Sequence, residues 1–162
     1  MFVLRYLYIL ALVIWLGGML VAGAVAAPSI FTVLEHWNTS QGRVLGGQVF
    51  GEILRRLNLL GYAMGTVMII CLVMKRLLGP RPLGTGIRIG LLTVMLALTA
   101  VSGLSITPRA AAIARDVIGP ISDLPATDAR RVDFDRLHQY SNWLFTATAI
   151  GGLVLLAWEA RE

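Results

Sequence analysis

The chain has 162 residues, of which 57% are hydrophobic and 14% are charged, whereas an ordinary soluble domain has about 25% charged residues. The mean hydropathy is +0.75, and a soluble fold of this length has too much surface to hide that composition. We therefore expect one membrane domain over residues 1–162. No basic stripe with interleaved aromatic residues is present, so the net charge of +5 does not indicate nucleic-acid binding. The single cysteine, Cys71, rules out an intrachain disulfide.

Four apolar segments predict four membrane-crossing helices, because a helix needs about 20 apolar residues to cross about 30 Å of hydrocarbon. The predicted crossings are about 4–27, 57–78, 87–106 and 137–158. The predicted fold class is therefore all-α, a polytopic membrane protein with a four-transmembrane-helix bundle. The stretches 28–56 and 107–136 predict a polar cap on one side of that bundle.

The first apolar segment has a basic start at Arg5 and ends in "AVAAPS", which resembles a signal-peptide cleavage site. We nevertheless expect this segment to be retained as a membrane helix. Pro28 lacks an amide hydrogen and restricts Ala27, so we expect the helix to stop or kink there. The stretch "PSIFTVLEHW" then predicts an interfacial segment in which Trp37 lies at the membrane boundary.

The second helix is predicted to be unusually long. Its candidate N-caps are Asn38, Thr39 and Ser40, and no proline follows before Leu78. A helix of nearly 40 residues is about 55 Å long, so its first half must project from the membrane or lie along it.

Capping signals also mark the later elements. Thr107 and Pro108 predict the cap and first turn of a short helix that ends near Val117. The stretch "GPISDLPATD" predicts a loop, after which Thr127 or Asp128 starts the long final helix.

The distribution of basic residues predicts the topology. Both long polar stretches follow odd-numbered crossings and share one side, whereas the short loop over 75–88 lies on the other side with both termini. That loop contains four basic residues and no acidic one: Lys75, Arg76, Arg81 and Arg88. The positive-inside rule then favours both termini in the cytoplasm, with the long polar stretches facing the periplasm or the cell exterior.

Small residues recur at every fourth position on the predicted helices, and this spacing lets helix backbones approach closely in lipid. The clearest examples are Gly18 with Ala22, Gly61 with Gly65, and Gly47 with Gly51. We interpret them as packing positions within the bundle, with formation of a homo-oligomer as the alternative.

A polar face begins the last crossing. His138, Ser141 and Asn142 are spaced by three and four residues, so a helix places them on one side. Imidazole, hydroxyl and carboxamide groups donate and accept hydrogen bonds. This pattern favours a hydrogen-bonded cap that ties the helices together, and the alternative is a site for a ligand or an ion.

Arg55, Arg56 and Asn58 are predicted to lie at the same membrane boundary, because both groups are on the long-loop side. Glu52 can pair with either arginine along its own helix. We therefore predict a polar cluster beneath the cap, formed by Arg55, Arg56, Asn58, His138, Ser141 and Asn142. The alternatives are simple interfacial anchoring and an anion-attracting pocket.

Metal, haem and enzymatic sites have weaker signals. Met64, Met68 and Cys71 share a face, and sulfur ligands suit Cu(I), but methionine also fills apolar cores. A haem would need two axial ligands, and the sequence contains only His36 and His138, so no cofactor is expected. No phosphate-binding glycine loop, nucleophile elbow or zinc-binding spacing is present, so we assign no catalytic residue and expect no enzyme.

Four motifs together carry a family resemblance. They are "WLGGMLVAGAVAAPSIF" at 15–31, "GRVLGGQVFGEILRRLNLLGY" at 42–62, "ITPRAAAIARD" at 106–116 and "FDRLHQYSNWL" at 134–144. The chain resembles the bacterial branch of a membrane family of unknown function whose eukaryotic members include transmembrane protein 205. It is more distantly similar to membrane proteins of the copper-resistance D type.

The resemblance implies a four-helix membrane protein and a link to tolerance of toxic compounds, including metal-based ones. It draws attention to a set of positions without giving any of them a catalytic role. These are Trp15, Gly17, Gly18, Pro28, Phe31, Gly42, Phe50, Arg55, Pro108, Arg115, Phe134, His138, Ser141 and Asn142.

The function that the sequence favours is that of a small, non-enzymatic membrane protein. It would bind a partner or a ligand, or serve as an accessory subunit of a membrane assembly. The alternative is transport, sequestration or tolerance of a soft metal such as copper, or of a small toxic solute.

Overall fold

The computed structural model describes residues 2–78 and 84–161, and within these ranges it contains helices and no strand. The elements in chain order are α1 (Phe2–Val21), η1 (Ala22–Ala26), α2 (Ala27–Trp37), α3 (Thr39–Leu78), α4 (Thr85–Val101), η2 (Ser102–Ile106), α5 (Thr107–Arg115), η3 (Ile121–Asp123) and α6 (Ala129–Glu159). They form four helical rods that are long and apolar enough to cross a membrane. The predicted fold class is thus confirmed.

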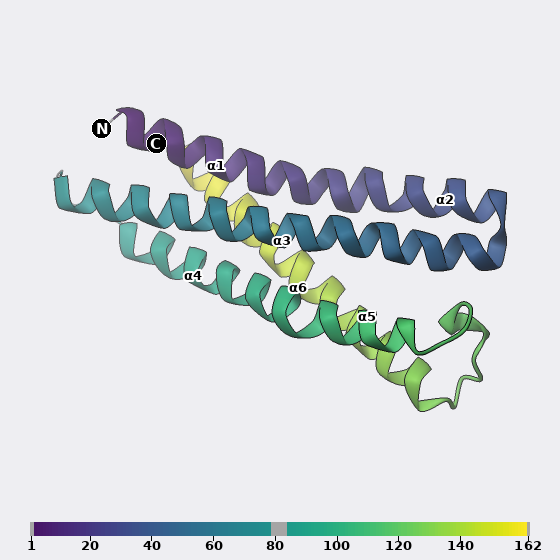
Figure 1. Cartoon of the computed structure of the whole chain (residues 1–162). Helices are drawn as coiled ribbons and strands as arrows, with labels where there is room; N and C mark the ends of the chain where they lie inside the picture. Colours follow the sequence, from purple (N-terminus) through teal and green to yellow (C-terminus); the bar gives the residue numbers. More distant parts are fainter. Residues whose placement is uncertain (1, 79–83, 162) are drawn as a thin grey trace.

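The four rods form a bundle in which α1 and α4 each pack against both α3 and α6. The two chain ends lie at one end of this bundle, which we call the terminal end (Figure 1). The core is built from large side chains of all four rods: Tyr8, Leu12, Trp15, Met68, Leu72, Leu92 and Leu155. Close packing of these side chains therefore holds the helices together along the terminal half of the bundle, because van der Waals contact is a main attraction between apolar helix faces in lipid.

At the opposite end, the cap end, the helices separate into two pairs (Figure 1). The first arm consists of α2 and residues 39–56 of α3, and the second arm consists of α5 and residues 129–140 of α6. Arg43 on the first arm donates a hydrogen bond from Nη1 to Oγ of Ser122, near the second arm, over 3.4 Å. The polar cap is thus split into two helical arms rather than formed as one layer.

Pro28 does not end the first helix, so of the two predicted outcomes, a stop or a kink, the stop was wrong. The chain remains helical to Trp37, and the π-helical turn η1 stands directly before the proline. In this turn, the N–H of Ala27 donates to the carbonyl of Ala22, five residues earlier. The wider turn makes room for the proline ring, whose missing N–H would otherwise interrupt an α-helix.

The same arrangement occurs at Pro108. The π-helical turn η2 precedes it, and the N–H of Thr107 donates to the carbonyl of Ser102. The predicted short helix is present as α5, but Thr107 makes no capping hydrogen bond, because α5 continues directly from α4. Each half of the chain therefore runs in the same order: helix, π-helical turn, proline, helix and long return helix.

The long second helix is confirmed, since α3 is unbroken over 40 residues. Its length of about 60 Å exceeds a bilayer core of about 30 Å. The carboxamide Oδ1 of Asn38 accepts a hydrogen bond from the N–H of Gln41, so Asn38 caps this helix as predicted. The side chain of Ser40, another candidate cap, lies outside the part of the chain that the structure describes.

The loop before the last helix is also confirmed, with one short 3₁₀ turn, η3, inside it. Asp128 caps α6, because its side chain accepts a hydrogen bond from the N–H of Arg130. Arg81, one of the basic residues predicted at the terminal end, lies outside the described residues.

Candidate functional site

Of the six residues predicted to form a polar cluster, two lie together. Asn58 of α3 and Ser141 of α6 line the same cavity. The other four are exposed and do not line it: Arg55, Arg56, His138 and Asn142. These four therefore do not join Asn58 and Ser141 at the cavity, in contrast to the predicted cluster of all six.

The two arginines stay outside because Glu52 holds them on the surface of α3. Its Oε2 atom lies 2.7 Å from Nε of Arg55, and its Oε1 atom lies 2.7 Å from Nε of Arg56. Pairing along the same helix, which the spacing predicted, is thereby confirmed. Since both guanidinium groups have this nearby carboxylate, neither needs a partner on α6.

His138 and Asn142 are exposed, and α6 diverges from α1 and α3 toward the cap end (Figure 1). The imidazole of His138 stacks on the ring of Phe134, one turn earlier on α6, with the ring centroids 6.3 Å apart. Only from Ser141 onward does this face of α6 approach the bundle. His36, the other histidine, is exposed on α2.

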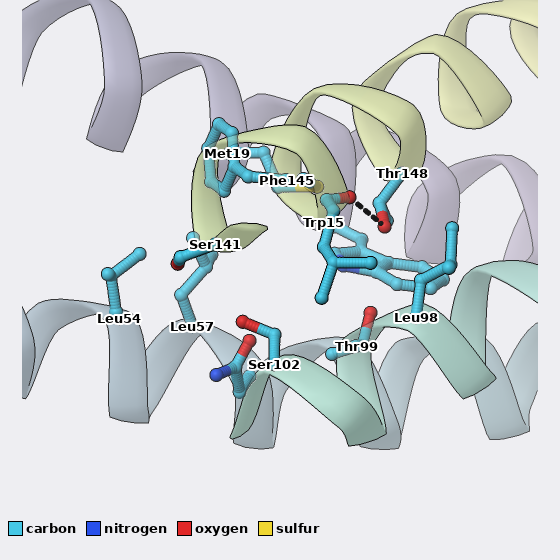
Figure 2. A pocket seen from close by; sticks show the side chains of 12 residues that line it. Trp15, Met19, Leu54, Leu57, Leu98, Thr99, Ser102, Ser141, Phe145 and Thr148 are labelled. Atoms are coloured by element: carbon cyan, nitrogen blue, oxygen red, sulfur yellow. Dashed lines mark hydrogen bonds between the residues drawn. The ribbon is translucent and has the colours of Figure 1, made fainter. Parts of the chain in front are cut away.

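The cavity lies where the two arms meet the bundle. All four rods contribute to its lining: Trp15, Met19, Leu54, Leu57, Asn58, Leu98, Thr99, Ser102, Ser141, Leu144, Phe145 and Thr148. Figure 2 shows Ser141 and Ser102 on different walls, with Trp15 at the back. The centre of a water-sized molecule can occupy about 20 Å³ of the cavity, and all the empty space between the lining atoms, open solvent included, is about 360 Å³. The cavity is therefore large enough for one water molecule.

The hydrogen bonds around the cavity leave some polar groups without a partner. The hydroxyl of Thr99 donates to the carbonyl of Met95 over 2.8 Å, and that of Thr148 donates to the carbonyl of Leu144 over 2.9 Å. In contrast, the buried Nδ2 of Asn58 has no hydrogen-bond partner among the described residues. The cavity therefore presents an unused amide donor.

The two serines on the lining add further unused donors. Within residues 2–78 and 84–161, neither Ser102 nor Ser141 makes a side-chain hydrogen bond. A serine hydroxyl supplies one donor and two acceptor positions. Together with Asn58, these residues can bind one polar atom from several directions.

Two glycines allow polar groups in and beside the cavity to approach a neighbouring helix closely. A Cβ atom added to Gly61 would lie 2.8 Å from Nε1 of Trp15. One added to Gly103, within η2, would lie 2.5 Å from the hydroxyl of Tyr62 and 3.0 Å from Nδ2 of Asn58. Both distances at Gly103 are too short for an ordinary contact, so the position of Asn58 depends on the absence of a side chain there.

The sulfur-containing residues lie deeper, toward the terminal end. Met68 and Cys71 are buried in the hydrophobic core, and Met64 packs against it from a partly buried position. Met19 of α1 and Met95 of α4 belong to the same core cluster. Sulfur atoms from three helices are thus gathered in one apolar environment.

A buried charge cluster at the terminal end was not predicted. Nη1 of Arg88 donates to Oε1 of Glu159 over 2.6 Å, and Nε of Arg5 lies 3.3 Å from Oε2 of the same carboxylate. The side chains of Arg88 and Glu159 are each 4% exposed. The guanidinium of Arg88 also lies over the ring of Trp158, 5.1 Å from its centroid. This ion cluster joins α1, α4 and α6.

The sequence contained a weak signal for this ion cluster. Arg88 stands one turn inside an otherwise apolar segment, and Glu159 ends another apolar segment on the same side of the membrane. Opposite charges at the ends of adjacent crossings are natural partners, because an unpaired charge near lipid is costly. In the sequence, Arg88 is counted with the basic loop, and that assignment leaves its pairing with Glu159 unpredicted.

The comparisons with known proteins give one match. A family model described as a domain of unknown function, DUF4149, matches residues 10–117. The matched segment contains Trp15, Asn58 and Ser102 of the cavity but ends before Ser141. No curated protein and no solved structure matches the chain. Because the family model covers more than half of the sequence, the chain belongs to the DUF4149 family.

Proposed function

We propose that this protein is a non-enzymatic integral membrane protein that binds a small molecule in the cavity between its four helices. The observation that carries the proposal is the buried Nδ2 of Asn58, which has no partner among the described residues. A buried donor without a hydrogen bond costs about 1–3 kcal/mol. A molecule that accepts a hydrogen bond in the cavity would remove that cost, and Ser102 and Ser141 are placed to assist it.

The shape of the bundle supports entry from the cap end. The terminal half is filled by the hydrophobic core and joined by the ion cluster of Arg5, Arg88 and Glu159. At the cap end, the two arms diverge (Figure 1), and Leu54 of the first arm and Ser141, next to the second arm, line the cavity. A ligand would therefore reach Asn58 between the arms.

The proposed location is a bacterial inner membrane, with both termini in the cytoplasm. Arg5, Lys75, Arg76 and Arg161 lie at the terminal end, in agreement with an excess of basic residues on the cytoplasmic side. The cavity would then open toward the periplasm. Labelling of a cysteine introduced at Gln48 by an impermeant thiol reagent in intact cells would test this orientation.

The direct test of ligand binding is native mass spectrometry of the protein, extracted from its own membrane into lipid nanodiscs. We expect a bound small molecule in the wild type and its loss in Asn58→Leu, which removes the amide donor. Gln48→Leu is the matched control, because Gln48 is exposed on the same helix. A wild type without any bound molecule, or one that Asn58→Leu retains, would contradict the proposal.

A role as an accessory subunit is compatible with ligand binding. Gly47 and Gly51 are neighbours on the first arm, and a Cβ atom added to either would meet nothing within 4 Å. Such open small residues allow another helix to approach closely. Gly51→Cys in a Cys71→Ala background should form crosslinks to a membrane partner or to a second copy, and crosslinking that stays at background level would argue against this role.

Soft-metal binding is the second candidate, and the convergence of Met19, Met68, Cys71 and Met95 in one core cluster favours it. The resemblance to the family that includes transmembrane protein 205 also supports this candidate. Copper bound in a fixed ratio to the purified protein, and lost in Met68→Leu with Cys71→Ser, would establish it. Met74→Leu is the matched control, because Met74 is exposed on α3.

A further inference from the structure

The cavity offers a ligand no charged partner. Its twelve lining residues are aromatic, aliphatic, sulfur-containing, hydroxyl or carboxamide side chains. Arg55 and Arg56, which were predicted to join it, are exposed and paired with Glu52. Moving an ion into such a site without a counter-charge costs several kcal/mol. A charged ligand is therefore strongly disfavoured.

The polar groups of the cavity favour a ligand with an acceptor atom. Nδ2 of Asn58 and the hydroxyls of Ser102 and Ser141 have no protein acceptor among the described residues, whereas Thr99 and Thr148 use their protons within their own helices. The cavity leaves about 20 Å³ for the centre of a water-sized molecule, which fits one oxygen-sized atom. The ligand atom that meets these donors is thus best an oxygen that accepts hydrogen bonds.

The lining also offers apolar surface. Met19, Leu57, Leu144 and Phe145 contribute apolar side chains to it, and the empty space is about 360 Å³ with open solvent included. A hydrocarbon body placed against these side chains is removed from water, which favours binding. The hydrogen-bond donors and the apolar side chains of the lining therefore fit one amphipathic molecule.

We propose that the cavity selects neutral molecules that carry one hydrogen-bond-accepting oxygen at the end of an apolar body. Ketones, ethers, esters and alcohols of moderate size belong to this class. The inference rests on the proposed function, because it specifies the ligand of the same cavity.

Charge selectivity is tested with a cysteine placed on the cavity wall. Ser141→Cys is prepared in the full chain with Cys71→Ala, in nanodiscs, and is treated with methyl methanethiosulfonate or with its trimethylammonioethyl and sulfonatoethyl analogues. We expect the neutral reagent to label this position at least about tenfold faster than either charged reagent. His138→Cys is the matched control, since His138 is exposed one turn earlier on α6 and all three reagents should label it.

The requirement for an oxygen acceptor is tested by protection of the same cysteine. Cyclohexanone and methylenecyclohexane have nearly the same shape, but only the ketone accepts hydrogen bonds. We expect the ketone to slow labelling at about tenfold lower concentration, the effect of one added hydrogen bond. Asn58→Leu should remove that difference while leaving protection by the hydrocarbon unchanged. If Ser141→Cys does not fold, Ser102→Cys offers the same measurement from another wall of the cavity.

The outcomes separate this inference from the proposed function. Equal labelling by neutral and charged reagents, or equal protection by the ketone and the hydrocarbon, would overturn the ligand class and leave a ligand cavity in place. If neither cavity cysteine is labelled while His138→Cys is, or if no probe protects, the cavity is not a ligand site. That result would overturn both proposals.

Discussion

The two ends of the bundle use the same kinds of polar side chain in opposite ways. At the terminal end, Arg88 and Glu159 form an ion pair whose side chains are each 4% exposed. On the cap side, the side chain of Glu52 is 44% exposed and that of Arg55 is 59% exposed. The terminal end thus places paired charges inside the bundle, whereas the cap end places them outside and leaves an unpaired amide inside. The buried ion pairs join α1, α4 and α6 at the terminal end, whereas the exposed pairs on the cap side stay within α3.

Removal of Glu159 should have the largest effect on stability. Glu159→Ala leaves Arg88 buried without its carboxylate, and breaking a buried ion pair from one side costs about 3–5 kcal/mol. We expect a loss of this size in the free energy of unfolding, measured by denaturant titration in detergent. Replacement of both partners, as Arg88→Leu with Glu159→Leu, should recover most of it. An unchanged midpoint in Glu159→Ala would show that the ion cluster does not close the terminal end.

The next largest effect is expected near the cavity. In Gly103→Ala, the added methyl group meets the Tyr62 hydroxyl at 2.5 Å, so the surrounding side chains must move. We expect a loss of about 1–3 kcal/mol, together with weaker ligand binding. Gly47→Ala is the control, because its methyl group would meet nothing within 4 Å and alanine favours the helix. If the two variants are equally stable, the close approach at Gly103 is not needed.

Removal of the Glu52 carboxylate at the cap end should reduce stability less than removal of Glu159 does. Glu52→Ala breaks two ion pairs, as Glu159→Ala does, but all three side chains are exposed to solvent and screened. We expect a loss several times smaller than that of Glu159→Ala under the same conditions. A loss of equal size would mean that exposed and buried charges contribute alike, which contradicts the contrast between the ends.

The smallest expected effect is the change of stability with pH that comes from the Asp128 carboxyl. The Arg130 side chain, which hydrogen-bonds Asp128, lowers the pKa of that carboxyl from 3.8 to about 2, with a further contribution from the Arg130 backbone N–H. A lowered pKa in the folded state stabilises the protein above pH 3.8, and this contribution is lost as the pH falls from 3.8 toward 2. Hydrogen exchange at the first turn of α6 should accelerate over this range. Arg130→Gln should shift the carboxyl titration, followed by NMR, back toward the ordinary pKa.

Features that depend on neighbouring residues in the chain could be predicted from the sequence. The four apolar rods, the 40-residue α3 and the caps at Asn38 and Asp128 all follow from local composition and breaker residues. Continuation of the helix through Pro28 could not be predicted in this way, because it depends on a π-helical turn. The wider hydrogen-bonded ring of this turn relieves the steric clash by which a proline often ends a helix.

The candidate site was only partly predictable, because it depends on the paths of helices that are distant in the sequence. Asn58 and Ser141 line the same cavity, where their two helices approach each other. His138 lies one turn earlier than Ser141, where α6 has diverged from α1 and α3, and no local sequence pattern predicts that divergence. The partnership of Arg88 with Glu159 likewise joins residues 71 positions apart.

The paired π-helical turns give the chain an unusual way to make space. Such a turn takes up one residue more than an α-helical turn, so each half of the protein carries the equivalent of a one-residue insertion at matching places. One turn supplies Ser102 to the cavity, and Gly23 of the other faces Phe145 on the cavity wall. The cavity thus depends on the two extra residues as well as on the side chains that line it. Related sequences that lack these two residues should have uninterrupted α-helical rods and no room for a ligand.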